Sequence, residues 1–122
     1  MPVKSKHFMD SAKALLSIED CPEINLRNAG SRAYYAVFHA AMDALERKGL
    51  GLIKVDKAGS HESVIATLCH ISPPAKSIGE ALGRIKRFRN DCDYQLHMAM
   101  HAKKVAMHIA QAEILIDKLS RI

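Results

Sequence analysis

The segment that decides the fold runs from Arg84 to His97 and reads RIKRFRNDCDYQLH. Apolar residues recur through it and just before it at intervals of three or four, at Ile78, Leu82, Ile85, Phe88 and Cys92. This spacing places the apolar side chains on one face of an α-helix. The segment therefore predicts a helix that buries one face and carries Arg89, Asn90 and Asp93 on the other.

Clear breaks divide the rest of the chain into further helices. We expect the first over residues 5–18, because Pro22 disfavours the helical conformation in the residue before it. We expect the second over residues 24–48, with Asn25 as a cap and the glycines of residues 49–51 as a stop. Both ranges carry apolar residues at helical spacing, so each helix is expected to bury one face. The alanines on that face of the second helix predict close packing against two neighbours.

A short third helix is expected to open at Ser60, with a capping signal, and to end before Ser72–Pro73–Pro74. Proline is tolerated in a first helical turn, so this break also starts the fourth helix, which contains the opening segment. The last helix is expected over residues 98–119, where apolar residues follow at alternating gaps of four and three. Because strand patterns are absent, residues 1–122 predict one all-α domain, an up-and-down helical bundle of four long helices and a short one.

Composition narrows the class of protein. Hydrophobic residues make up 48% of the 122 residues, which is typical of a globular domain. No apolar run approaches the roughly 18 residues that span a bilayer, and the first residues carry no secretory signal. The three cysteines are scattered, as in proteins of a reducing cytosol, and Cys69 and Cys92 fall within apolar patterns that predict core packing. We therefore expect a cytoplasmic protein without a membrane segment.

The charge favours an anionic partner. The formal net charge is +5, and one short stretch contains Arg84, Lys86, Arg87 and Arg89. Arginine can bind phosphate through two N–H groups at once and stays charged at any working pH, so it suits an RNA or nucleotide backbone. The alternative is a solvated face whose cations pair with the two aspartates that follow.

Histidines and tyrosines supply the other candidate side chains. His97 and His101 are four residues apart, which suits a zinc ion on one helix face, but no acidic residue lies between them as in His-Glu-x-x-His. We expect no metal and no cofactor, since a single histidine near neutral pKa serves better as a general acid or base. The adjacent Tyr34 and Tyr35 lie about 100° apart on a helix, so one can face the core and the other a groove.

Three stretches together resemble the HEPN domains (higher eukaryotes and prokaryotes nucleotide-binding). RNAGSRAYYAVFHAA, residues 27–41, resembles the long second helix of that family. RNDCDY, residues 89–94, resembles its Arg-x-x-Ala-Asp-Tyr segment with Cys92 where Ala is usual, and GSHESVI, residues 59–65, resembles the short helix between them. The resemblance implies an up-and-down bundle that pairs two-fold, with a cleft at the dimer interface.

Many HEPN proteins are metal-independent ribonucleases, and several are toxins encoded beside a small nucleotidyltransferase antitoxin. Their catalysis rests on an Arg followed by a polar residue and on a His after four to six intervening residues. Arg89 and Asn90 match the first pair, whereas His97 follows after seven residues, about 12 Å along an uninterrupted helix. A helix that ends near Tyr94, or the second chain of a dimer, would bring an imidazole closer.

The resemblance implies a protein that acts on RNA, as a metal-independent endoribonuclease toxin of a toxin–antitoxin or defence pair. In this hypothesis Arg89 stabilises charge on the phosphate, and His97 handles the proton of the ribose 2′-hydroxyl. Four further side chains would bind the substrate: Asn90, Tyr94, Arg87 and Lys86. The implied partners are RNA or a nucleotide, a nucleotidyltransferase-type antitoxin and a second copy of the chain. The alternatives are a non-catalytic module that binds a nucleotide or a partner protein, and a helical scaffold without a ligand.

Overall fold

The computed structural model describes residues 3–57 and 59–122. It contains five α-helices, which are α1 (Ser5–Leu16), α2 (Glu23–Arg47), α3 (Ser60–Cys69), α4 (Pro73–Tyr94) and α5 (Ala102–Leu119). These two ranges contain no strand, and none of their helices combines the length and hydropathy that a membrane span requires. The predicted all-α class is confirmed, with α3 as the short helix.

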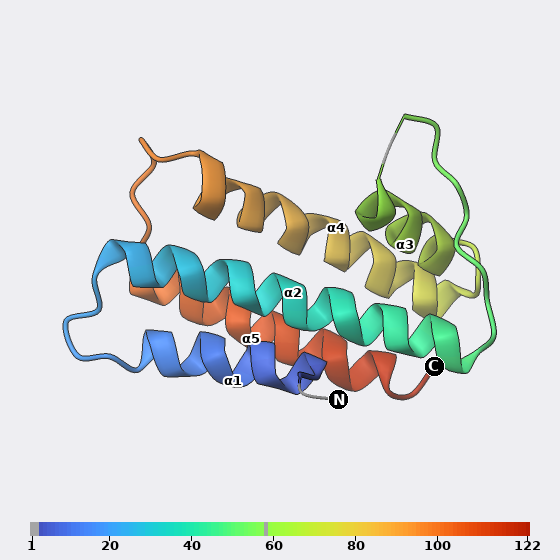
Figure 1. The fold of residues 1–122 in the computed structure, drawn as a ribbon, viewed down its shortest axis with the longest axis horizontal. Coiled ribbons are helices and arrows are strands. Elements are labelled where there is room, and N and C mark those ends of the chain that lie inside the picture. Colours follow the sequence, from blue (N-terminus) through green and yellow to red (C-terminus); the bar gives the residue numbers. More distant parts are fainter. Residues whose placement is uncertain (1–2, 58) are drawn as a thin grey trace.

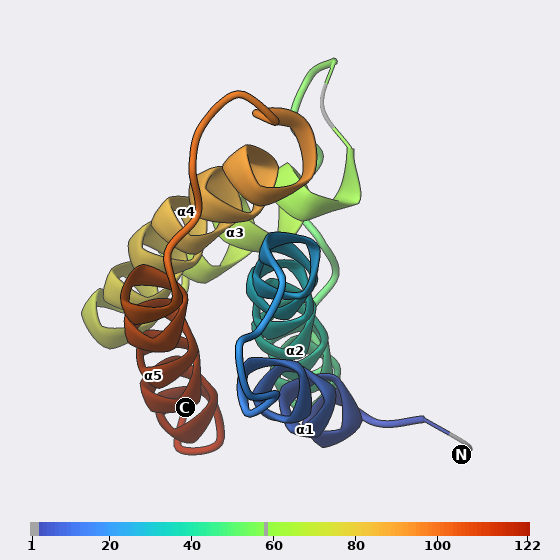
Figure 2. The ribbon, with the colours of Figure 1, turned by 90° about the vertical axis from the view of Figure 1, so that its left-hand side faces the viewer.

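Helices α1, α2, α4 and α5 run alternately in opposite directions along the long axis of the molecule, and α3 lies beside the first half of α4 (Figure 1). α2 contacts each of the other four helices, whereas α1 and α4 make no contact with each other within the described part of the chain. In the end view, α1 and α2 lie on one side and α4 and α5 on the other (Figure 2). α2 is therefore the helix against which the rest of the chain packs.

Small residues on α2 let its neighbours approach closely. Its fully buried alanines include Ala29, Ala36, Ala41 and Ala44. The tightest place is Gly30, where a Cβ would lie 2.7 Å from the Sγ of Cys92 and 3.0 Å from the ring of Phe88. Glycine costs roughly 1 kcal/mol relative to alanine inside a helix, and here it gives α4 room to cross α2. The close packing predicted from the alanine-rich face is confirmed.

The first two helices differ from the predicted ranges at their ends. α1 ends at Leu16 rather than at residue 18, and Asp20 in the following turn adopts a left-handed conformation with φ of 49°. α2 begins at Glu23, directly after Pro22 in an extended conformation. Asn25 lies within the first turn and donates its backbone N–H to the Pro22 carbonyl, so the prediction that Asn25 caps this helix is wrong.

The starts of α3 and α4 follow the sequence signals more closely. α3 begins at Ser60 as expected, but the N-cap position is occupied by Gly59, and no side chain caps the helix there. At the start of α4, the Ser72 hydroxyl accepts a hydrogen bond from the backbone N–H of Ala75, and Pro73 is the first helical residue. The prediction of a proline in the first turn of the fourth helix is confirmed.

The last helix begins four residues later than predicted, at Ala102 instead of residue 98. Residues 95–101 form a turn and an irregular segment, although Met98 fits the apolar period of the helix. The reason lies far away in the sequence, because the carbonyls of this segment bind the side chain of Arg27 on α2. Met100 from the same segment is buried in the core in place of Met98.

Candidate functional site

Arg89 is the central charged group of the candidate site. It projects from α4 toward α2 and is only 8% exposed. Its Nη2 donates a hydrogen bond to the Tyr35 hydroxyl at 3.2 Å, and its Nη1 donates to the Asn90 side chain at 3.0 Å. The guanidinium carbon lies 5.1 Å from the ring centre of Tyr34 and 5.2 Å from that of Tyr35, a distance at which aromatic faces attract cations. Both tyrosines thus help to hold one arginine.

The hydrogen-bonding capacity of Arg89 is not exhausted by these contacts. Its Nε is buried and has no partner within the described ranges. The nearest carboxylate, that of Asp93, lies 3.6 Å from Nη1 and also accepts a hydrogen bond from the Ser31 hydroxyl at 3.2 Å. A buried donor without a partner costs free energy, so Arg89 is a cation held in place with a free N–H group.

His61 of α3 joins the same cluster. Its Nδ1 forms a hydrogen bond with the Tyr34 hydroxyl, and its ring stacks on Phe38 with ring centres 4.3 Å apart. Burial lowers the pKa of His61, and the positive charges of Arg89 and Lys86 lower it further. Burial raises the pKa of Tyr34 far above its ordinary value. At neutral pH the imidazole is therefore uncharged and the phenol keeps its proton.

The prediction that one of the two adjacent tyrosines faces the core is confirmed. Tyr34 is fully buried, and the Tyr35 side chain is only partly buried and reaches Arg89. The role of His61 was missed, because its partner Tyr34 lies 27 positions away and no local pattern links the two. The only available signal was the resemblance of residues 59–65 to the short helix of the HEPN family.

A groove of about 390 Å³ lies between α3 and α4, next to this cluster. Lys86 and Glu62 face each other across it, with Nζ and Oε1 2.5 Å apart. Arg84 and Arg87 are exposed and make no ion pair among the described residues. The groove is lined by Glu62, Ile65, Cys69, Gly79, Glu80, Gly83, Arg84, Lys86, Arg87 and Asn90. The cations outnumber the two carboxylates, so the groove suits an anionic ligand.

Glycines on α4 shape the floor of the groove. A Cβ at Gly79 would lie 2.9 Å from the Sγ of Cys69 and 3.1 Å from the carbonyl oxygen of Ile65, so Gly79 lets α3 approach α4. A Cβ at Gly83 would meet only the guanidinium of Arg87, at 3.9 Å. At Gly79 and Gly83 the floor of the groove is therefore backbone without a side chain, and cations lie on either side of it.

The structure brings together four of the six predicted site residues. Lys86, Arg87 and Asn90 line the groove, and Arg89 lies behind Asn90, joined to it by a hydrogen bond. The catalytic and substrate-binding roles of these residues stay predictions.

The other two predicted residues lie apart from the groove. Tyr94 is the last residue of α4 and is 71% exposed. His97 is exposed in the turn that follows, and no hydrogen bond or ion pair within the described ranges joins it to Arg89. The helix does end at Tyr94, as one of the two sequence-based possibilities required. That ending still leaves His97 without a contact to Arg89, and its role as general acid or base stays a prediction.

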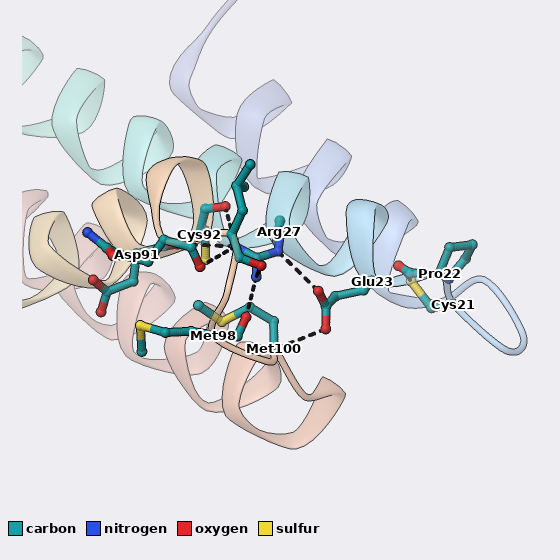
Figure 3. A network of polar contacts seen from close by, with 10 residues as sticks. Cys21, Pro22, Glu23, Arg27, Asp91, Cys92, Met98 and Met100 are labelled. Atoms are coloured by element: carbon teal, nitrogen blue, oxygen red, sulfur yellow. Dashed lines mark hydrogen bonds and ion pairs between the residues drawn. The ribbon is translucent and has the colours of Figure 1, made fainter.

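A second buried arginine, Arg27 on α2, fixes the segment that carries His97 (Figure 3). It is 5% exposed, and its Nε donates to the Glu23 carboxylate at 3.3 Å. Its two terminal nitrogens donate to backbone carbonyls at the end of α4 and just after it, those of Asp91, Cys92, Gln95, Leu96 and Met98. Helix ends leave such carbonyls without partners, so Arg27 acts as a side-chain cap for α4.

Glu23 completes this cap from the other side. Its second carboxylate oxygen accepts the backbone N–H of Met100 at 3.1 Å. This backbone hydrogen bond lowers the pKa of Glu23, and the neighbouring Arg27 adds to the effect. In the sequence, Arg27 is notable only as the start of a stretch that resembles the HEPN family. Its capping role could not be predicted from neighbouring residues, because its carbonyl partners lie 64 to 71 positions away.

The cysteines and the two histidines considered for zinc, His97 and His101, suggest no further chemistry. Cys92 is 1% exposed, and the Sγ atoms of Cys69 and Cys92 lie against Gly79 and Gly30, so both thiols pack as predicted. Burial raises the pKa of Cys69 and raises that of Cys92 to about 11, which keeps both thiols protonated. Among the described residues, no three side chains of His, Cys, Asp or Glu are grouped as a metal site would need. His101, the other half of the spacing considered for zinc, occupies the N-cap position of α5.

Comparison of the chain with models of known protein families gives no match, and comparison with curated protein sequences gives none either.

Proposed function

We propose that this protein binds RNA, with the sugar–phosphate backbone in the groove between α3 and α4 and one phosphate next to Arg89. The observation that carries the proposal is the buried Nε of Arg89, which has no partner among the described residues and lies beside a basic groove. A phosphate oxygen is the acceptor that a guanidinium binds best. Asn90 connects the two parts, since it lines the groove and accepts a hydrogen bond from Arg89.

The exposed arginines of the groove supply the rest of the binding energy in this proposal. Arg84 and Arg87 carry charges that no carboxylate of the described chain neutralises by an ion pair. Each phosphate that they neutralise releases counterions, so the affinity for RNA falls as the salt concentration rises. This salt dependence separates the proposal from a scaffold protein without a ligand.

The resemblance to HEPN domains supports an extension of the proposal. In it, the chain forms a two-fold dimer in the cytoplasm, cleaves RNA without a metal ion and pairs with a nucleotidyltransferase-type antitoxin. The free state of all three cysteines agrees with a reducing compartment. Cleavage would use Arg89 to stabilise charge on the phosphate and a histidine to handle the proton of the 2′-hydroxyl.

A second candidate function is a non-catalytic module that binds RNA, a nucleotide or a partner protein. It is favoured by the position of His97, which is exposed in a turn that Arg27 holds and makes no contact with Arg89 within the described ranges. In this alternative the groove and Arg89 bind the anion, and no group performs the proton transfer.

The test is incubation of the pure protein with labelled single-stranded RNA in EDTA, together with binding measurements at several salt concentrations. Cleavage in EDTA supports the nuclease, whereas salt-sensitive binding without cleavage supports the module. Arg84→Gln combined with Arg87→Gln is expected to weaken binding about tenfold and to lower the salt slope. Absence of both binding and cleavage in the unmodified protein would contradict the proposal.

A matched control removes the same charge elsewhere. Lys6→Gln combined with Lys13→Gln also lowers the net charge by two, but it changes α1, which makes no contact with α3 or α4 in the described structure. The control pair is expected to bind RNA nearly as well as the unmodified protein. Equal losses in both double variants would show that net charge, and not the groove, governs binding.

A further inference from the structure

The two ring nitrogens of His61 have different surroundings. Nδ1 is engaged with the hydroxyl of Tyr34. Nε2 makes no hydrogen bond within the described ranges, and this atom is not fully buried. One nitrogen is therefore fixed inside the protein while the other stays accessible, which is the arrangement of a histidine that presents one nitrogen to a ligand.

The hydrogen bond from Tyr34 determines which nitrogen carries the proton. The Tyr34 side chain is fully buried, and its hydroxyl has no other hydrogen-bond partner in the described ranges. A buried hydroxyl must use its proton or lose the free energy of a hydrogen bond. Tyr34 therefore donates to Nδ1, and the neutral imidazole carries its own proton on Nε2. His61 thus offers an N–H donor and no lone pair at the accessible nitrogen.

His61 and Arg89 share the same two tyrosines. The ring centre of Tyr34 lies 5.6 Å from that of His61 and 5.1 Å from the guanidinium carbon of Arg89. Tyr35 lies 6.0 Å from the imidazole centre and 5.2 Å from the same carbon. Two donors from different helices, α3 and α4, are thereby brought to one aromatic cluster next to the groove.

We propose that the Nε2–H of His61 and the guanidinium of Arg89 bind the same phosphate group. The proposal rests on the proposed function and assigns α3, rather than the turn after α4, as the source of the imidazole at the site. His61 acts as a neutral hydrogen-bond donor that positions the phosphate. It cannot accept a proton from the substrate, since its accessible nitrogen already holds one. Lys86, whose Nζ lies 2.5 Å from the Glu62 carboxylate, adds a second positive charge at the same place.

Two substitutions separate ligand binding from support of the fold. The amide of Asn at position 61 can occupy the place of Nδ1 and accept from Tyr34, but it leaves the place of Nε2 empty. The longer Gln can put an N–H group near the place of Nε2. We expect His61→Asn to bind single-stranded RNA about tenfold more weakly and His61→Gln to lose much less. A role limited to holding Tyr34 predicts the opposite order, which would overturn the proposal.

A spectroscopic measurement on the unmodified protein keeps the proposal testable even if a variant fails to fold. Two-bond ¹H–¹⁵N spectra of the histidine rings are expected to show His61 with its proton on Nε2. We also expect the Nε2 signal to shift when oligouridine RNA or AMP is added to saturation. A shift with both shows that one phosphate group suffices, and a shift with RNA alone shows that the strand is needed. A proton on Nδ1, or a signal that neither ligand moves, would overturn the proposal.

Arg89→Lys tells failure of this inference from failure of the proposed function. If Arg89→Lys weakens RNA binding while His61→Asn binds as the unmodified protein does, the role of His61 is wrong and the groove remains. If neither variant changes binding, the proposed phosphate site at Arg89 is itself wrong, and the proposed role of His61 is wrong as well. Melting curves followed by circular dichroism check that each variant is folded.

Discussion

The molecule contains two buried arginines that differ in how completely they are bonded. Each of the three nitrogens of Arg27 donates to the protein, to a carboxylate or to the backbone carbonyls at the end of α4. Arg89 lies on α4 itself, and its Nε has no partner within the described ranges. Burial is nearly equal, at 5% and 8% exposure. Under the proposed function, unused hydrogen-bonding capacity, rather than burial, distinguishes Arg89, which is expected to bind a ligand, from Arg27, which caps α4.

The largest effect is expected for Arg27→Ala. It removes every side-chain donor that caps α4 within the described ranges, so the Cys92 carbonyl loses its partner, the Gln95 carbonyl keeps only the backbone N–H of Met98, and the turn after the helix is released. Breaking a buried charged network of this kind costs about 3 kcal/mol of unfolding free energy, measured by urea denaturation. Arg32→Ala is the control, because Arg32 is exposed and donates only to the Ser11 hydroxyl. A loss below about 1 kcal/mol for Arg27→Ala would show that the cap is not structural.

Arg89→Lys is expected to have a smaller effect on stability and a clear effect on binding. Lysine keeps the charge but loses the planar guanidinium that reaches Tyr35 and Asn90 together. We expect a loss of about 1 kcal/mol in unfolding free energy and a tenfold or greater loss of RNA affinity, about 1.4 kcal/mol. Denaturation and filter binding measure the two quantities. If Arg89→Lys is as unstable as Arg27→Ala and its RNA affinity is unchanged, both arginines have a structural role only.

The smallest effect concerns the Nδ1 of His108 on α5, a second buried nitrogen that has no partner in the described part of the chain. The ring stacks on Phe88 with centres 3.5 Å apart, and burial, followed by the charge of Lys104, lowers the pKa of His108. Unlike Arg89, this side chain can stay neutral. Because the unfolded chain binds the proton more readily, stability is full above the unfolded pKa of about 6.5 and falls as the pH drops through it toward the lower folded value.

His108→Leu removes this titration and is expected to flatten the fall in stability between pH 7 and pH 5. Part of the fall is expected to remain, because the pKa of His61 is lowered as well. Thermal melts at a series of pH values measure the slope. An unchanged slope in His108→Leu would show that His108 is not the group that links stability to pH.

Local sequence patterns predicted the parts of the fold that depend on neighbouring residues. The apolar period through Ile85 and Phe88 places α4 correctly, and the alanines of α2 predict its close packing. The start of α5 was predicted wrongly, because the apolar period extends back to Met98 whereas the helix begins only at Ala102. Arg27, 71 positions away from Met98, holds that residue's carbonyl outside the helix.

The candidate site follows the same division. Lys86, Arg87, Arg89 and Asn90 lie close together because one helix presents them all, and their roles stay predictions. The position of His61 depends on a contact between α2 and α3, which are separated by 12 residues in the sequence. The resemblance to HEPN domains pointed instead to His97, whose role stays a prediction. α4 ends at Tyr94, and no hydrogen bond or ion pair within the described ranges joins His97 to Arg89.

The most direct test of the contrast between the two arginines is a map of backbone amide shifts in a ¹H–¹⁵N spectrum as single-stranded oligouridine is added. We predict the largest changes at the groove, for Glu62, Lys86 and Asn90, and little change at Met98 and Met100, which the Arg27 cap holds. Shifts that are largest at the cap, or no shifts at the groove when RNA is in large excess, would contradict the assignment of Arg89 and the groove as the RNA-binding site.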